Sequence, residues 1–135
     1  MFRVGIIGAG WIADKMAISL SPLDDYCVEA IASRSLDKAQ EFAKRYNIRK
    51  AYGSYEELVA DEDIDLVYIA TPHSHHFEHS MLALKYNKPL LVEKAFTANA
   101  REAQILLDTA REKDVFITEA IWTRYMPLSQ TINEI

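Results

Sequence analysis

Residues 4–13 read VGIIGAGWIA and are the clearest indication of the fold class. The first part, Val4–Ile7, is a short apolar run that leads into glycines, as a buried strand does. Beyond the glycines, Ile12, Met16 and Leu20 recur every four residues, which predicts a helix with one apolar face. The stretch therefore predicts a strand, a tight turn and a helix in immediate succession.

The turn has the form G-x-G-x-x-A. Gly8 permits a tight turn, Gly10 leaves room for a pyrophosphate beside the backbone, and Ala13 lets the helix pack closely on the strand. The helix N-terminus adds free N–H groups and the positive end of its dipole. Its place between a strand and a helix favours a dinucleotide-binding turn over a tight turn with no ligand. We expect cofactor contacts from Gly8, Ala9, Gly10, Trp11 and Ile12.

Strands and helices keep alternating along the rest of the chain. Apolar runs predict further strands at Cys27–Ala32, Lys50–Tyr52, Ile64–Ala70, Pro89–Val92 and Val115–Ile121, with helical spacing between them. Such alternation, with strands apolar on both faces, is typical of a parallel sheet covered by helices on both sides. We predict an α/β, doubly wound parallel sheet with strand order 3-2-1-4-5-6. An α/β domain without a nucleotide site is the alternative.

Composition limits the size of the protein and its partners. The 135 residues suffice for one well-cored domain, and a formal charge of −5 argues against nucleic acid as a partner. No apolar run approaches the roughly 20 residues that span a membrane. The single cysteine, Cys27, lies in an apolar run, which favours a buried, inert thiol. We expect a cytoplasmic protein with no nucleic-acid and no membrane partner.

The end of the second predicted strand bears on the choice between NAD and NADP. NAD enzymes usually place an acid there for the ribose 2′-hydroxyl, but this sequence reads Ala32-Ser33-Arg34-Ser35. Arg34 can pair with a 2′-phosphate and stack on adenine. Lys38 would lie in the first turn of a helix, where a cation opposes the dipole unless a phosphate binds. Ser33, Arg34 and Lys38 predict NADP, with NAD as a second option and solvated cations as the alternative.

Further polar and aromatic residues follow the later strands. Ligands of such sheets bind outside the carboxyl ends of the strands, so these segments should share one crevice with the glycine turn. They are Ala70-Thr71-Pro72-His73 and His76 after the fourth strand, Glu93-Lys94 at the end of the fifth, and Trp122-Thr123-Arg124 after the sixth. Their convergence on one edge of the sheet predicts a functional crevice.

Lys94 is the strongest candidate for a chemical role. Hydride transfer from an alcohol also requires that the hydroxyl proton moves, and a lysine can act as acid or base or orient the hydroxyl. A lysine amine ordinarily holds its proton, so base action needs burial or a nearby cation. A surface lysine at the end of a strand is the alternative.

Four histidines near the fourth strand raise the question of a metal. His75 and His79 are four residues apart on a predicted helix, as some zinc ligands are. No cysteine and no suitably spaced acid completes an obvious site, so we expect no metal. Solvated histidines at a helix start are the alternative for this pair, whereas His73 and His76 are candidates for the nicotinamide end.

These motifs together resemble the glucose–fructose oxidoreductase / inositol dehydrogenase family. The resemblance covers essentially the whole chain and rests on the glycine turn, Ala70-Thr71-Pro72 with His76, and Val92-Glu93-Lys94. The segment 119–124, EAIWTR, is most similar to the dihydrodiol dehydrogenase branch, which is NADP-dependent. The resemblance implies an NAD(P)-dependent oxidoreductase acting on CH–OH groups of a carbohydrate or diol.

The resemblance also implies roles for individual residues. It places Lys94 near nicotinamide and substrate as a catalytic residue, and Trp122 near the substrate pocket. It brings Thr71, Pro72, His73 and His76 toward the ribose and nicotinamide. One departure is Ala95, where the family usually has proline after the lysine. Losing proline frees φ and restores a backbone donor, which puts the placing of Lys94 in question.

A second departure is length, because family members continue into a C-terminal α/β domain that supplies most of the substrate pocket. We expect residues 1–121 to form the dinucleotide-binding domain and residues 122–135 to begin the connection to that second domain. The chain would then be a fragment, a truncated form or a degraded gene product that turns over little substrate. An incomplete edge would expose apolar surface, which favours a homo-oligomer. A non-catalytic nucleotide-sensing or partner-binding module is the alternative function.

Overall fold

The computed structural model describes residues 1–133 and contains one six-stranded sheet with the order β3-β2-β1-β4-β5-β6. Each strand runs parallel to its neighbours. The strands are β1 (Phe2–Ile7), β2 (Tyr26–Ala32), β3 (Lys50–Tyr52), β4 (Leu66–Ile69), β5 (Leu90–Val92) and β6 (Ile117–Glu119). The predicted fold class and strand order are confirmed.

A helix follows each strand. The α-helices are α1 (Trp11–Leu20), α2 (Leu36–Tyr46), α3 (Tyr55–Ala60), α4 (His76–Lys85), α5 (Ala100–Glu112) and α6 (Pro127–Asn133). Short 3₁₀ helices, η1 (His73–His75) and η2 (Trp122–Tyr125), precede α4 and α6. The predicted last helix extends to Ile135, but residues 134 and 135 lie outside the described part of the chain.

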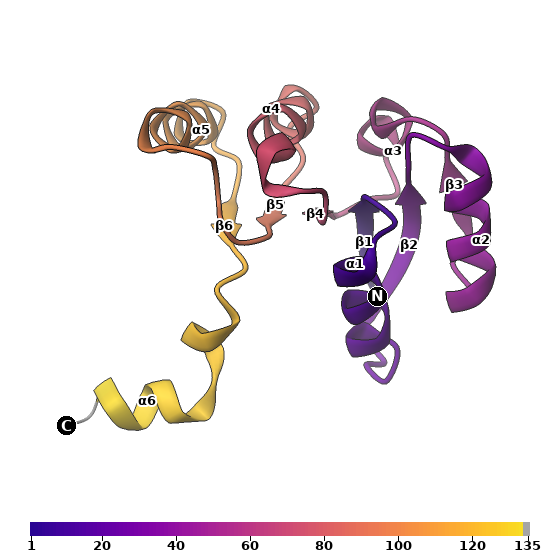
Figure 1. Ribbon diagram of the computed structural model, residues 1–135, viewed down its shortest axis with the longest axis horizontal. Coiled ribbons are helices and arrows are strands. Elements are labelled where there is room, and N and C mark those ends of the chain that lie inside the picture. The colour runs from indigo at the N-terminus through magenta and orange to yellow at the C-terminus, as the bar shows by residue number, and fades with distance from the viewer. Residues whose placement is uncertain (134–135) are drawn as a thin grey trace.

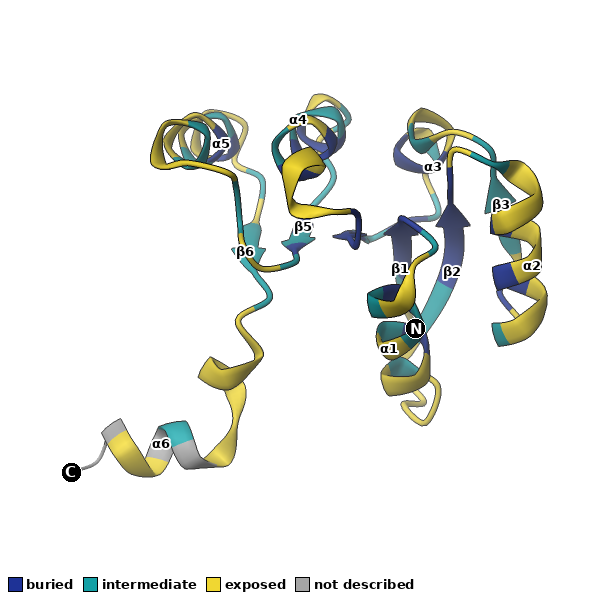
Figure 2. Ribbon diagram, in the orientation of Figure 1, coloured by how far each residue is buried: buried dark blue, intermediate teal, exposed yellow. Residues whose placement is uncertain are grey.

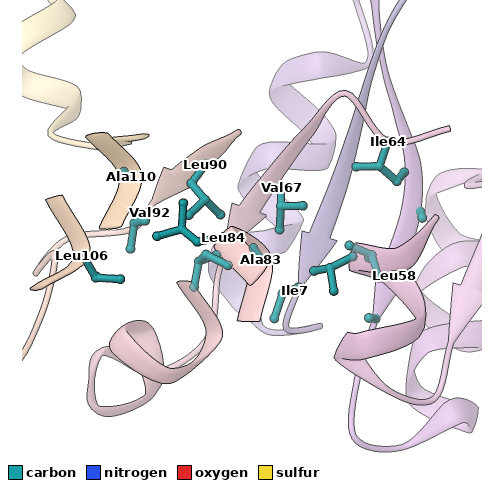
Figure 3. Packing of buried hydrophobic residues seen from close by; sticks show 14 residues of the cluster. Ile7, Leu58, Ile64, Val67, Ala83, Leu84, Leu90, Val92, Leu106 and Ala110 are labelled. Carbon is teal, nitrogen blue, oxygen red and sulfur yellow. The ribbon is translucent and has the colours of Figure 1, made fainter. Parts of the chain in front are cut away.

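The helices cover the two faces of the sheet unequally (Figure 1). On one face, α3, α4 and α5 pack against a cluster that includes Ile7, Val67 and Val92 (Figure 3). On the other face, α1 and α2 pack against a cluster that includes Ile6 and Ile31. Neighbouring strand residues alternate between the clusters, so both faces of the strands are buried, as the doubly apolar runs predict.

No helix within residues 1–133 covers the second face beside β5 and β6, whereas Tyr68 of β4 packs in the cluster under α1 and α2. Helix α6 extends away from the body (Figure 1). Figure 2 shows η2 and most of the described part of α6 as exposed.

Side-chain caps begin three helices as their spacing suggests. Ser35 Oγ accepts from the Lys38 backbone N–H at 3.4 Å, at the start of α2. Ser54 and Glu57 form a reciprocal capping box at the start of α3. Asn99 Oδ1 accepts from the N–H of Glu102 at 3.0 Å, at the start of α5.

Strand β5 is one residue shorter than its apolar run, and β4 and β6 are shorter by three and four residues. Before β4, Ile64 N–H donates to Asp61 O at 3.3 Å, so this part of the run forms a turn. Before β6, Val115 N–H donates to Ala110 O at 2.9 Å and closes the end of α5. After β6, Trp122 N–H turns back onto Ala120 O at 3.0 Å. Backbone groups that the apolar pattern assigns to strands therefore form hydrogen bonds in local turns instead.

No helix within residues 1–133 is long and apolar enough to cross a membrane.

Candidate functional site

The glycine turn follows β1 and lies against Ala70 and Thr71, the residues that follow β4. Gly8 has φ of 101°, and a Cβ atom there would lie 2.9 Å from Thr71 Cγ2 and 3.0 Å from the Ala70 carbonyl. Glycine is therefore required for both the backbone conformation and the close approach. Ala13 is fully buried, so α1 packs closely on the sheet. The sequence predicts these two small residues for the same reasons.

Gly10 forms the open side of the turn. It is the N-cap of the ten-residue α1, no side chain caps that helix, and a Cβ on Gly10 would meet no atom within 4 Å. The first N–H groups of a helix lack intrahelical partners, and the dipole is positive there. The turn therefore has the open backbone and uncapped helix end that a pyrophosphate fits.

Arg34 lies in a cleft of about 320 Å³ between the end of β2 and the start of α4. The cleft is lined by Arg34, Tyr55, Thr71, Pro72, His75, Glu78 and His79. Among residues 1–133, no ion pair is formed by Arg34 or Lys38. An exposed guanidinium beside aromatic and imidazole rings suits an anionic ligand that carries a flat ring.

Lys38 lies in a second cleft, of about 300 Å³, that reaches the glycine turn. Its lining includes Ala9, Gly10, Trp11, Asp14, Lys38, Glu41 and Arg45. Arg45 is held by Asp14 and Glu41, each at 3.4 Å, so those two carboxylates already have a cation. No acid follows β2 directly. The first acidic residue after β2 is Asp37, in the first turn of α2.

The segment after β4 is anchored by two buried histidines. His76 is 1% exposed, and its Nδ1 and Nε2 lie 2.8 Å from the carbonyl oxygens of Ala95 and Thr71 respectively. His79 Nδ1 lies 2.9 Å from Thr71 Oγ1, and burial lowers the pKa of His79. Solvation, the alternative for His79, is therefore wrong, because its ring is buried against Thr71 and Tyr55.

The Lys94 loop, residues 93–97, leads from the end of β5 toward the start of α5. Lys94 is exposed, and its peptide bond to Ala95 is cis. Glu93 accepts from the Tyr68 hydroxyl at 2.5 Å through Oε1 and from the Lys94 N–H at 3.1 Å through Oε2. Burial, and then the hydrogen bond to Glu93, raise the pKa of Tyr68.

A third cleft, of about 410 Å³, lies on the uncovered half of the sheet face beside α1. Its lining is mainly apolar and includes Ile12, Met16, Tyr68, Leu91, Glu93 and Trp122. Ile12, Glu93 and Trp122 thus line the same cleft. His73 and Arg124 are exposed on η1 and η2, and no described hydrogen bond or ion pair joins either side chain to the other site residues.

Metal ligation has no support in the described residues, which contain no group of three or more His, Cys, Asp or Glu arranged around one point. His75 and His79 instead stack with ring centroids 5.6 Å apart. Cys27 is half-buried, and burial is the first cause that raises the pKa of its thiol.

Sequence reasoning missed several residues that shape the crevice, including Tyr55, Tyr68, His79 and Glu119. A signal for His79 exists, because His76, His79 and Ala83 share one helical face. No local pattern reveals that Glu119 accepts from the Phe96 N–H at 2.7 Å, since 23 residues separate the two. Contacts between loops of different strands appear only in the folded molecule.

Comparisons with known proteins show the family of the chain. A family model described as "Oxidoreductase family, NAD-binding Rossmann fold" (GFO_IDH_MocA) matches residues 2–120. D-xylose 1-dehydrogenase (NADP(+)) of Hypocrea jecorina is 47% identical over 97% of this chain and 37% of its own length. Trans-1,2-dihydrobenzene-1,2-diol dehydrogenase of Danio rerio is 42% identical over 98% of this chain and 40% of its own.

A solved structure has the same fold as this chain. KijD10, a 3-ketoreductase from Actinomadura kijaniata in complex with NADP, superposes with a TM-score of 0.91 and 30% identity. The match covers 98% of this chain and 42% of that protein, and the chain spans about two fifths of the curated relatives named above. Since the family model matches most of its residues, the chain belongs to the GFO_IDH_MocA family of oxidoreductases with an NAD-binding Rossmann fold.

Proposed function

We propose that this chain is the NADP-binding part of an oxidoreductase acting on a carbinol group of a sugar, polyol or diol. The observation that carries the proposal is the open Gly10 turn at the uncapped end of α1, flanked by the clefts that hold Arg34 and Lys38. When bound, the cofactor would supply a nicotinamide ring that accepts or donates hydride.

The glycine turn would hold the pyrophosphate. Gly8 and Ala9 shape the turn, and Gly10, Trp11 and Ile12 present their backbone at the start of α1. Neutral N–H groups at a helix start bind a phosphate without a charged partner. This assignment is supported by the absence of any atom within 4 Å of a Cβ built on Gly10.

The region after β2 would favour NADP over NAD. Arg34 and Lys38 line two different clefts, and Ser33, which directly precedes Arg34, is buried. An arginine binds a phosphate through paired, charge-assisted hydrogen bonds, which a ribose hydroxyl cannot replace. The Lys38 ammonium adds charge beside the glycine turn.

Lys94 would assist proton transfer at the carbinol oxygen. Its exposed side chain follows β5, where the crevice of such sheets lies. Ala70, Thr71, Pro72, His73, His76 and Glu93 would line the ribose and nicotinamide side. Trp122 and Arg124 would also contact the cofactor, with Trp122 near the substrate. The first group comes from the ends of β4 and β5, and the second from η2.

We further propose that residues 1–121 form the cofactor domain and that residues 122–135 lead toward a substrate domain. The relatives' greater length supports this division. The 135 residues should then bind cofactor weakly and show little or no dehydrogenase turnover. Robust turnover by this chain alone would contradict the division.

A nucleotide-sensing module that carries out no chemistry is the second candidate, and Ala95 in the Lys94 loop favours it. Turnover separates the two functions if the assay uses the full reading frame. Loss of turnover in Lys94→Ala with NADPH binding retained supports the enzyme. Absence of turnover in the unchanged protein supports the sensor.

Exchanging the charge of Arg34 tests the cofactor assignment. Arg34→Asp should weaken NADPH binding by about 10- to 100-fold and bring NADH affinity level with it or above it, because a charged hydrogen bond contributes about 1.5–3 kcal/mol. Arg111→Asp is the matched control, since Arg111 is an exposed cation on α5. Equal losses in both variants, or no loss in Arg34→Asp, would refute the assignment.

A further inference from the structure

Glu93 links a buried tyrosine to the backbone of Lys94. Its Oε1 accepts from the Tyr68 hydroxyl at 2.5 Å, and its Oε2 accepts from the Lys94 N–H at 3.1 Å. The two oxygens of one planar carboxylate cannot move independently. Whatever fixes the orientation of Glu93 therefore also fixes the backbone nitrogen from which the Lys94 residue begins.

Tyr68 is well suited to fix that orientation. It lies in β4, is 2% exposed and packs in the cluster under α1 and α2. Burial and the Glu93 carboxylate both raise the pKa of its phenol, so the hydroxyl stays a donor across the physiological range. A rigid ring in the central sheet thus holds a carboxylate at the edge of the crevice.

The rest of the Lys94 loop is also held by side chains from other elements. The Phe96 N–H donates to Glu119 Oε1 at 2.7 Å, and the Ala95 carbonyl lies 2.8 Å from His76 Nδ1. The exposed Lys94 amine has no such anchor in the described residues and sits at the end of a flexible stem. The place of that amine therefore depends on how firmly its own backbone is held.

We propose that Tyr68 is a positioning residue for Lys94 and acts through the Glu93 carboxylate. The proposal rests on the function proposed for Lys94 above. Tyr68 and Glu93 transfer no proton in this account. They set where the Lys94 side chain starts, and so how often its amine faces the carbinol oxygen.

Tyr68→Phe tests the first step, because it removes the hydroxyl and keeps the ring in the core. Solvent-exchange NMR should show the Lys94 amide exchanging about tenfold faster, since a charge-assisted hydrogen bond is weakened. Tyr52→Phe is the matched control. It removes a 2.9 Å hydrogen bond from a tyrosine to Asp61 in a different part of the sheet and should leave the Lys94 amide unchanged.

Three results would overturn this step. They are an unchanged Lys94 amide in Tyr68→Phe, the same acceleration in Tyr52→Phe, and faster exchange throughout β4 and β5, which would mean a general loss of stability. Glu93→Ala serves as a second variant should Tyr68→Phe fold poorly. It removes the acceptors of both hydrogen bonds, so it should also release the Lys94 amide.

The link to function needs a reporter on the Lys94 amine. Reductive ¹³C-methylation labels the lysines, and the Lys94 signal is identified by its loss in Lys94→Arg. Saturation with NADPH should shift this signal in the unchanged protein, and the shift should fall by about half or more in Tyr68→Phe while NADPH affinity changes less than about twofold. A full shift in Tyr68→Phe would contradict the proposal.

The two parts of the experiment separate the two proposals. If NADPH binds neither protein, the proposed function fails, and the amide measurement still decides whether Tyr68 holds Lys94. If NADPH binds normally and the amide measurement is negative, the positioning role fails and the proposed cofactor site stands.

Discussion

Thr71 joins three parts of the crevice through separate atoms. Its Cγ2 would be 2.9 Å from a Cβ on Gly8, its Oγ1 lies 2.9 Å from His79 Nδ1, and its carbonyl oxygen lies 2.8 Å from His76 Nε2. The glycine turn and the start of α4 are therefore placed by one residue. The sequence places Thr71, Gly8 and His76 at this edge because each follows a strand. The contact of Thr71 with His79, which lies inside the α4 segment, could not be predicted from the strand ends alone.

Gly8 and Gly10 should respond differently to the same substitution. Gly8→Ala puts Cβ against Thr71 at a φ of 101° and should lower the free energy of unfolding by about 1–3 kcal/mol. Gly10→Ala meets open space and should cost at most about 1 kcal/mol, the price of a poorer N-cap. Urea denaturation measures both.

NADPH binding by the same two variants completes the comparison. Gly10→Ala should bind NADPH more weakly although it is folded, because the methyl group occupies the space proposed for the pyrophosphate. Unchanged NADPH affinity in Gly10→Ala would mean that the phosphates lie elsewhere. Equal stability of the two variants would mean that the Gly8 contact with Thr71 is relaxed in solution.

At the scale of elements, apolar patterns predict the existence and order of the strands better than their ends. The run Ile64–Ala70 is apolar except for Asp65, but β4 begins only at Leu66 because Ile64 closes a turn on Asp61 and Asp65 pairs with Arg3. Capping residues predict helix starts accurately, since Ser54 and Glu57 satisfy backbone groups within four residues. Local chemistry is visible in the sequence, whereas competition between distant segments is not.

A charged network at the start of β1, β3 and β4 should make stability depend on acid. Hydrogen bonds from Lys50 lower the pKa of Asp63, and those from Arg3 lower the pKa of Asp65, below the ordinary value of 3.8. Burial raises the pKa of Asp61, but hydrogen bonds led by that from Lys50 outweigh it. Since the folded pKa values are lower, this stabilisation is present above the unfolded value and is lost as pH falls through the folded ones.

Unfolding midpoints in urea should therefore decline as pH falls below about 4. Lys50→Met removes the shared cation and should flatten this decline, whereas Lys113→Met, which pairs only with the Asn87 amide among the described residues, should leave it unchanged. Identical acid profiles for the two variants would show that the network does not contribute.

At the scale of the whole molecule, the sheet divides into a covered half and a half with one open face. Helices α1 and α2 cover β1, β2 and β3 (Figure 1). An apolar cleft on the other half is lined by Leu91, Trp122 and Tyr125. Strand order and helix succession predict which face each helix covers, because crossover connections are right-handed. They do not predict where η2 and α6 lie, because these two elements make few contacts with the rest of the domain.

The open face should promote association as protein concentration rises. Tyr125 is 66% exposed beside the cleft, so Tyr125→Ser should reduce the association seen by sedimentation velocity. Phe116→Ser is the control, since Phe116 is 61% exposed but lies in a different cleft, beside α5. A monomer at every concentration, or equal effects of both variants, would contradict this role of the open face.

The central claim is that the turn after β1 and the cations after β2 hold NADP. The most direct measurement is a titration with NADPH and NADH, followed by the fluorescence of Trp11, which is 71% exposed in the turn, and Trp122. We expect saturable quenching, with NADPH bound about tenfold or more tightly than NADH, as a charge-assisted phosphate contact implies. NADH binding as tightly as NADPH, or no response to either, would contradict it.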